Sequence, residues 1–128
     1  MTREEKDLVL QDLCARLPYS PICHIIGENG ADIDDILTTS TIQNLDVWVV
    51  KPYLRPMSSM TEEERDYVVK HSLGYTASIG GGKKDEKLYF HFKAESFDWL
   101  NAHHFDYRGL IDKGLAIKVT EGNNPYKD

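Results

Sequence analysis

The sequence lacks any long hydrophobic run. Its longest uninterrupted apolar stretch is the four residues of Val47–Val50, whereas a membrane-spanning helix needs about 20. The first residues, Met1–Glu5, are mostly charged or polar, so we expect no secretory leader. These absences argue against membrane association and predict a cytoplasmic protein.

Cysteine is also scarce, with two residues in a chain of 128. Cys14 and Cys23 do not have the Cys-x-x-Cys spacing of redox and metal sites, and two cysteines make no disulfide framework. Cys14 falls on the apolar stripe of an expected helix and Cys23 within an apolar strand. Both are therefore interpreted as buried small hydrophobic residues.

An excess of basic residues is missing as well. Lys and Arg number 15 against 21 Asp and Glu, which gives a formal net charge of −6. Proteins that bind DNA or RNA need a basic face to displace phosphate counterions, so direct nucleic-acid binding is disfavoured. Residues 28–46 contain five acids and no Lys or Arg. This stretch is either a solvated turn and strand face or an acidic docking surface for a basic partner.

The remaining composition is that of an ordinary globular domain. Hydrophobic residues make up 41% and charged residues 28% of the chain. A length of 128 residues predicts a single domain over residues 1–128, and residues 121–128 have little to bury and should fray.

The first half of the chain predicts a helix followed by a sheet. Thr2 and Glu5 form a capping box, and the spacing of Leu10, Leu13, Cys14 and Leu17 predicts a helix over 3–16. Strands are predicted at 21–27, 32–40 and 43–51, with the apolar Val47–Val50 as a central, buried strand. Two prolines exclude residues 51–56 from the centre of a sheet.

The second half predicts helices with a late hairpin. Thr61 and Glu64 form a capping box for a helix over 62–72, and a glycine-rich loop joins β-like segments at 75–79 and 88–92. Ser96 can cap a helix over 97–105 and Asp106 a short helix over 107–113, before a last strand at 115–119. The order predicts an α+β fold: an N-terminal helix, a small antiparallel sheet that could be a partly closed barrel, and a C-terminal helical corner.

Two longer motifs carry a resemblance. They are KPYLRPMSSMTEEE at residues 51–64 and FDWLNAHHFDYRGLI at residues 97–111, and KGLA at 113–116 and DLCARLPY at 12–19 add to them. Together they resemble a group of small uncharacterised proteins of gut bacteria that occur in prophage-like and mobile-element gene neighbourhoods. The resemblance implies a phage-associated bacterial setting. It implies no activity, so it transfers no functional residue.

The densest polar cluster lies in the second motif. On a helix His103 and His104 are about 100° apart and cannot face one ligand, so no metal site is predicted. The segment is interpreted as structural, with Asp106 as a cap and with Tyr107 and Arg108 closing the corner through hydrogen bonds. No catalytic residue and no cofactor are predicted.

The leading functional hypothesis is a non-enzymatic, protein-binding accessory module of a prophage-like element. An alternative is an acidic inhibitor that mimics nucleic acid and blocks a host DNA-binding enzyme. A third hypothesis is a hydrolase-type enzyme that uses His103, Asp106 and Arg108. Aromatic and arginine side chains are enriched in binding hot spots. The candidate partner-binding residues on this basis are Tyr53, Arg55, Trp99, His103, Tyr107 and Arg108.

Overall fold

The N-terminal helix forms where the sequence predicts it but buries a different face. The computed structural model describes residues 2–71 and 94–126 of the chain. Helix α1 spans Arg3–Arg16, and the Thr2–Glu5 capping box is present. Its buried residues are Val9, Asp12, Leu13 and Arg16, whereas Leu10 is 40% exposed and Cys14 is exposed. The interpretation of Cys14 as buried was therefore wrong. Asp12 and Arg16, which form an ion pair four residues apart, occupy the buried face of α1 instead.

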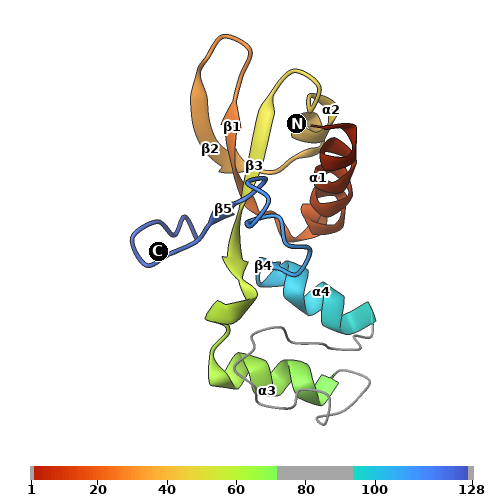
Figure 1. Cartoon of the computed structure of the whole chain (residues 1–128), viewed down its shortest axis with the longest axis vertical. Helices are drawn as coiled ribbons and strands as arrows, with labels where there is room; N and C mark the ends of the chain where they lie inside the picture. Colours follow the sequence, from red (N-terminus) through yellow and green to blue (C-terminus); the bar gives the residue numbers. More distant parts are fainter. Residues whose placement is uncertain (1, 72–93, 127–128) are drawn as a thin grey trace.

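The sheet is mixed and open. The strands are β1 (Ile22–Ile26), β2 (Asp32–Ile36), β3 (Val49–Pro56), β4 (Phe105–Asp106) and β5 (Ile117–Lys118). The order is β2-β1-β3-β4, with β5 also paired to β3. β1 is antiparallel to β2 and β3, whereas β4 and β5 are parallel to β3 (Figure 1). The α+β prediction is confirmed, but the sheet is mixed where an antiparallel one was predicted, and it is open, so the possible partly closed barrel was wrong.

Residues 38–50 depart most from the prediction. A short helix, α2 (Thr39–Gln43), begins at a capping box between Thr38 and Thr41, and turns lead to β3. The predicted strands at 32–40 and 43–51 therefore overlap a helix. Val47 and Val49 are 47% and 45% exposed, so a central strand buried on both faces was also wrong. Local hydroxyl capping here prevails over the β propensity of Ile, Thr and Val.

Strand β3 runs through both prolines, although they were expected to exclude residues 51–56 from the centre of a sheet. Residues 49–52 pair with β1, and residues 53–56 pair with β5 and β4. Pro52 is buried at the point where the strand changes partners, and Pro56 ends the strand. A missing amide hydrogen is tolerated at both places because no regular ladder continues through them.

The helical elements of the second half are shifted from their predicted bounds. Two 3-10 turns, Leu17–Tyr19 and Met57–Ser59, follow α1 and β3. Helix α3 spans Glu62–His71 with the expected Thr61–Glu64 capping box. Helix α4 spans Ala94–Ala102, so Ser96 lies inside it and does not precede it. The predicted hairpin at 75–92 and the end of the α3 prediction lie outside the described residues.

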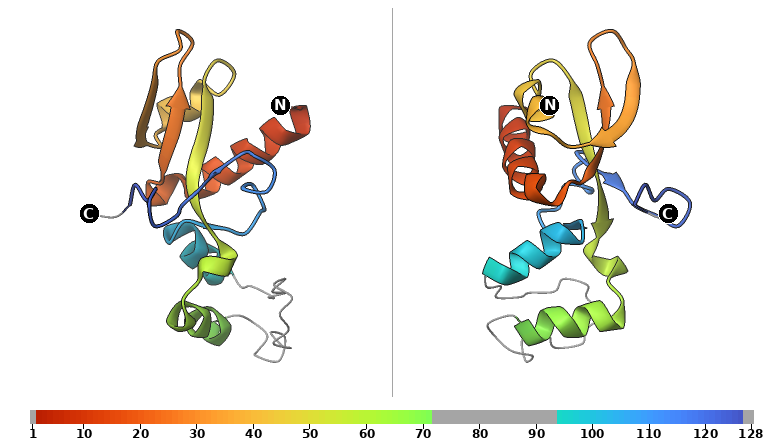
Figure 2. Two further views of the ribbon diagram at one scale, coloured as in Figure 1. Left: turned by 60° about the vertical axis from the view of Figure 1, so that its left-hand side comes forward. Right: turned by 180° about the vertical axis from the view of Figure 1, so that it is seen from behind.

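The described residues form two hydrophobic cores. The upper core packs α1 against the sheet, and the lower core lies between α3, α4 and β4 (Figures 1 and 2). The upper core includes Leu13, Cys23, Val50, Leu54 and Leu110, and the lower core is Met60, Val68, Leu100 and Phe105. Burial raises the pKa of the Cys23 thiol to about 12, with Asp12 adding to the effect, so this cysteine is an unreactive core residue.

Residues 121–126 do not form the frayed tail that was expected. The Tyr126 hydroxyl accepts a hydrogen bond from Ile22 N–H at 2.9 Å and donates one to the Tyr53 carbonyl at 2.8 Å. It thereby bridges β1 and β3 where their ladder ends. The Tyr126 ring stacks on His104 with ring centroids 3.9 Å apart. No helix among the described residues is long and apolar enough to cross a bilayer.

Candidate binding surface

Two of the six predicted partner-binding residues lie on β3 and are engaged within the fold. Tyr53 is 6% exposed, and its hydroxyl donates to the Asp34 carboxylate at 3.0 Å. Burial is the main reason that the pKa of Tyr53 is raised, and its bond to Asp34 adds to the shift. Arg55 donates to both carboxylate oxygens of Glu64, at 2.8 and 3.0 Å, and lies 4.0 Å from the centroid of the Phe105 ring. Neither head group is free to bind a partner.

The ion pair with Arg55 joins β3 to the first turn of α3. Partial burial by itself would raise the pKa of Glu64, but hydrogen bonds from Arg55 and Thr61 outweigh it and lower the pKa. Glu64 therefore stays ionised and both caps α3 and holds Arg55 over Phe105. This arrangement fixes the lower core against the sheet.

Trp99 and His103 belong to an aromatic stack on α4. The Trp99 ring centroid lies 4.1 Å from that of His103, 5.3 Å from Tyr67 and 5.8 Å from Phe105. His103 is exposed, and its Nδ1 lies 3.0 Å from the Trp99 carbonyl oxygen. The stack covers the edge of the lower core, and His103, its outermost ring, faces solvent.

Tyr107 and Arg108 close the corner as predicted. The Tyr107 hydroxyl donates to Asn101 Oδ1 at 2.9 Å, and Arg108 donates to Asp12 Oδ1 at 3.1 Å and to the Tyr107 hydroxyl at 3.2 Å. His103, by contrast, faces solvent. The hydrolase hypothesis required His103, Asp106 and Arg108 to converge on one pocket. In the structure His103 stacks on Trp99, Arg108 bonds Asp12, and Asp106 bonds backbone amides, so the three side chains do not converge.

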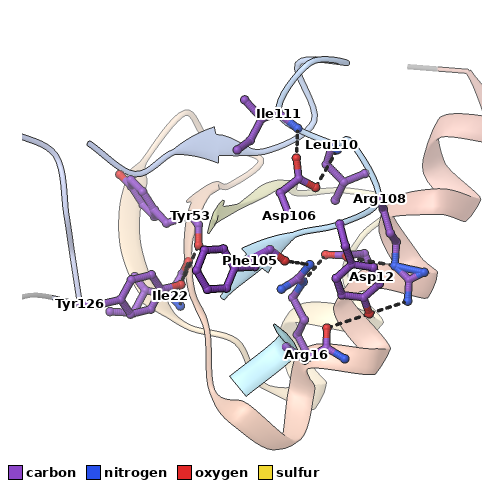
Figure 3. A network of polar contacts seen from close by, with 12 residues as sticks. Asp12, Arg16, Ile22, Tyr53, Phe105, Asp106, Arg108, Leu110, Ile111 and Tyr126 are labelled. Atoms are coloured by element: carbon purple, nitrogen blue, oxygen red, sulfur yellow. Dashed lines mark hydrogen bonds and ion pairs between the residues drawn. The ribbon is translucent and has the colours of Figure 1, made fainter. Parts of the chain in front are cut away.

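Sequence reasoning missed the residues at the centre of this network, Asp12 and Arg16 (Figure 3). Both are fully buried, and Arg16 Nε donates to Asp12 Oδ2 at 2.8 Å. Arg16 Nη2 also donates to the Phe105 carbonyl at 2.7 Å, so α1 is tied directly to β4. The i, i+4 spacing of opposite charges was the available signal, but on an exposed helix face it indicates a weak surface pair.

Asp106 caps the chain, though not as the start of a helix. Residues 107–113 form turns rather than the predicted helix, and the Asp106 carboxylate accepts from the amides of Leu110 and Ile111, both at 2.9 Å. The N-cap of a helix over 107–113 would instead accept from the amide of Arg108 or Gly109. Gly109 has φ +77°, and a Cβ there would meet nothing within 4 Å. Its left-handed backbone, not crowding, therefore accounts for glycine.

We predict that Asp106→Ala lowers the free energy of unfolding by about 0.5–2 kcal/mol, because two turn amides lose their acceptor. Chemical denaturation of the variant and of Asp112→Ala, an exposed acid of the same turns, measures the difference. The turn interpretation fails if both variants are equally stable.

A second polar cluster lies on the β1–β2 hairpin. His24 Nδ1 is 2.7 Å from Asp34 Oδ1, and His24 Nε2 is 3.9 Å from Asp32 Oδ2. Asp34 also accepts from Tyr53, so one carboxylate links three neighbouring strands. No group of three or more His, Cys, Asp or Glu side chains among the described residues could hold a metal ion. The cluster fixes the position and register of β2.

Strand β2 forms an edge of the sheet, and all five of its residues are exposed. Leu37 N–H bonds the Pro21 carbonyl, and Gly27 N–H bonds the Ala31 carbonyl. Since hydrogen-bonded pairs alternate along an antiparallel ladder, the backbone groups of Asp32, Asp34 and Ile36 point away from β1. Within the described residues no other strand pairs with them.

A cavity of about 550 Å³ adjoins this edge on the helix-covered side of the sheet. Its apolar lining includes Ile25, Ile33 and Trp48, and its polar lining includes Glu28 and Asp35 together with hydroxyls of α2. Ile33 and Asp35 share this face because they pair with Ile25 and Cys23, whose side chains point to the core. The free edge and the cavity therefore form one continuous surface, which we call the β2 surface.

Neither a family model nor a curated protein matches the chain, and no solved structure matches it. The function must accordingly be argued from the geometry of the site itself.

Proposed function

We propose that this protein is a non-enzymatic module that binds a partner protein by adding one of the partner's strands to the edge of β2. The observation that carries the proposal is the five-residue edge with outward backbone groups and two exposed isoleucines, Ile33 at 54% and Ile36 at 49%. Such an edge is a template for another strand, and natural proteins blunt edges that have no partner with charged side chains, proline or a bulge. The sequence of β2 contains no lysine or proline, and its three aspartates restrict pairing to a strand that complements their charge.

This proposal relocates the binding site from the residues that composition favoured. Five of the six candidates use their polar or aromatic groups inside the fold, and His103 is the outer member of an aromatic stack. The β2 surface instead offers both main-chain groups and a cavity for side chains, which is the combination used in β-strand addition. A cytoplasmic, prophage-associated accessory role remains part of the proposal, supported by the two unpaired cysteines and the motif resemblance.

The nucleic-acid mimic receives less support. A mimic needs free carboxylates spaced along one face. On β2 Asp32 and Asp34 share a face, but both lie against His24, and Asp35 points to the other face. We therefore favour strand addition over mimicry.

Site-specific photo-crosslinking tests the proposal in the cells that encode the protein. A photoreactive residue at Ile36 should trap one discrete protein adduct. The same residue at Leu10, an equally exposed apolar position on α1, should trap none. Adding Asp32→Pro should abolish the adduct with little loss of stability, because the Asp32 N–H faces away from β1 and only the 3.9 Å contact between its carboxylate and His24 is removed. The proposal is overturned if Leu10 gives the same adduct or if Asp32→Pro leaves it unchanged.

A further inference from the structure

We infer that the β2 surface binds an extended basic segment in which lysine or arginine alternates with apolar residues. This inference rests on the proposed function and specifies the chemistry of the partner. It is carried by the charges on the two sides of the edge strand and by the position of the cavity beside it.

The charges are of one sign on both faces. Asp32 and Asp34 lie on the open face of the sheet, and Asp35 lies on the helix-covered face, beside Glu28 in the cavity lining. The cavity lining contains no Lys, Arg or His. On the open face His24 lies against Asp34 and Asp32, and Lys51 lies opposite His24 on β3, one strand further from the edge. A strand added at this edge would therefore meet Asp35 and Glu28 with no basic side chain in the cavity lining, and on the open face Asp32 and Asp34, which share the single imidazole of His24.

The position of the cavity on one face of β2 explains why basic and apolar residues should alternate along the partner segment. In paired strands, residues directly opposite each other point to the same face, so partner residues opposite Ile33 and Asp35 point into the cavity. A lysine there can lie with its methylenes along Ile33 and Trp48 and its ammonium near Asp35 and Glu28. Partner residues between the basic ones point to the open face, where the exposed side chain of Ile36 favours an apolar neighbour.

A second copy of the chain is a poorer occupant. Two β2 strands of sequence DIDDI would place aspartates opposite or diagonal to aspartates, and like charges in facing positions destabilise a sheet. The same aspartates attract a basic partner segment. They therefore favour that segment over a second copy of the chain at the free edge of β2.

The test uses the full chain and a labelled seven-residue peptide in which lysine alternates with valine. Fluorescence anisotropy compares it with a peptide carrying glutamate for lysine and with one N-methylated at alternate amides, which cannot form a ladder. The protein variants are Asp35→Asn, which keeps the oxygen that accepts from Ile36 N–H, and the matched control Asp112→Asn.

We expect the lysine peptide to bind and both altered peptides to bind at least about tenfold more weakly. Asp35→Asn should weaken binding of the lysine peptide about three- to tenfold, and Asp112→Asn should leave it unchanged. Equal binding of the glutamate or the N-methylated peptide, or equal affinity of the two variants, overturns the inference. A dimer in sedimentation that Asp35→Asn strengthens also overturns it, because a second copy would then be the occupant.

The two proposals fail separately. If the lysine peptide does not bind while the Ile36 probe still traps a protein, the basic partner is wrong and the binding module stands. If the Ile36 probe traps no protein, the proposed binding module is wrong. The inference of a basic partner, which depends on it, is then wrong as well.

Discussion

Asp12→Ala is expected to lower the free energy of unfolding by about 3–5 kcal/mol, the largest single effect that we predict. The substitution leaves Arg16, which is fully buried, and Arg108, whose side chain is 20% exposed, without their shared carboxylate. A buried cation without a counter-charge is costly because it has left water and gains no compensating interaction. Domains of this size are stable by about 5–15 kcal/mol, so the loss is a large part of the total.

Urea denaturation followed by circular dichroism measures this effect at neutral pH. The matched control is Asp7→Ala, which removes an exposed carboxylate from the same helix and should change stability by less than about 0.5 kcal/mol. If Asp12→Ala does not fold, Asp12→Asn keeps the hydrogen-bond geometry and should show a smaller loss. Equal stability of the Asp7 and Asp12 variants would contradict a buried network between α1 and β4.

The second prediction concerns acid pH and His104. Burial, with smaller contributions from the charges of Arg16, His103 and Arg55, lowers the pKa of His104 from 6.5 to about 4. The folded protein thus resists protonation of His104, whereas the unfolded chain binds the proton at its ordinary pKa. The stability associated with neutral His104 is complete above pH 6.5 and is lost as the pH falls through 4.

We expect this loss to be about 2 kcal/mol between pH 7 and pH 4, reduced from the full linkage value because His104 is partly exposed to solvent. His104 has φ +63°, a left-handed conformation that asparagine also adopts readily. In His104→Asn the pH dependence should therefore be weaker than in the unmodified protein by that amount.

Unfolding free energies at several pH values for the unmodified protein, His104→Asn and His103→Asn test this assignment. His103 is exposed and is a lesser cause of the lowered pKa of His104, so the pH profile of His103→Asn should lie much closer to that of the unmodified protein than the profile of His104→Asn does. Identical profiles for all three proteins would show that His104 does not bury its neutral form between Tyr126 and the cationic side chains.

Local signals in the sequence predicted the starts of α1 and α3 and the two strands of the first hairpin. The Thr2–Glu5 and Thr61–Glu64 capping boxes form as expected, and β1 and β2 lie within their predicted ranges. Each of these signals is complete within a few residues, so it does not depend on what packs against it. The acidic character of residues 28–46 can likewise be read directly from the sequence. Its alternative interpretation as a docking surface for a basic partner is part of our proposal.

The candidate site could not be found in the same way. Tyr53, Arg55 and Tyr107 have the composition of a binding hot spot, but hydrogen bonds to residues on other elements of the fold occupy them. The β2 edge, conversely, became a candidate only once the strand order left it unpaired. Composition indicates which side chains can bind, whereas exposure depends on which neighbours the fold brings to them.

By itself, the sequence determined the α+β class, the caps and the acidic character of the hairpin, because short-range backbone and charge preferences set these features. Only the tertiary structure decided that Asp12 and Arg16 turn inward, that β3 changes partners at Pro52 and that Tyr126 joins β1 to β3. Each of these depends on a partner far along the chain, such as the Phe105 carbonyl for Arg16. The free energy of burying a charge, a proline or a tail residue is set by that distant partner, and no local pattern contains it.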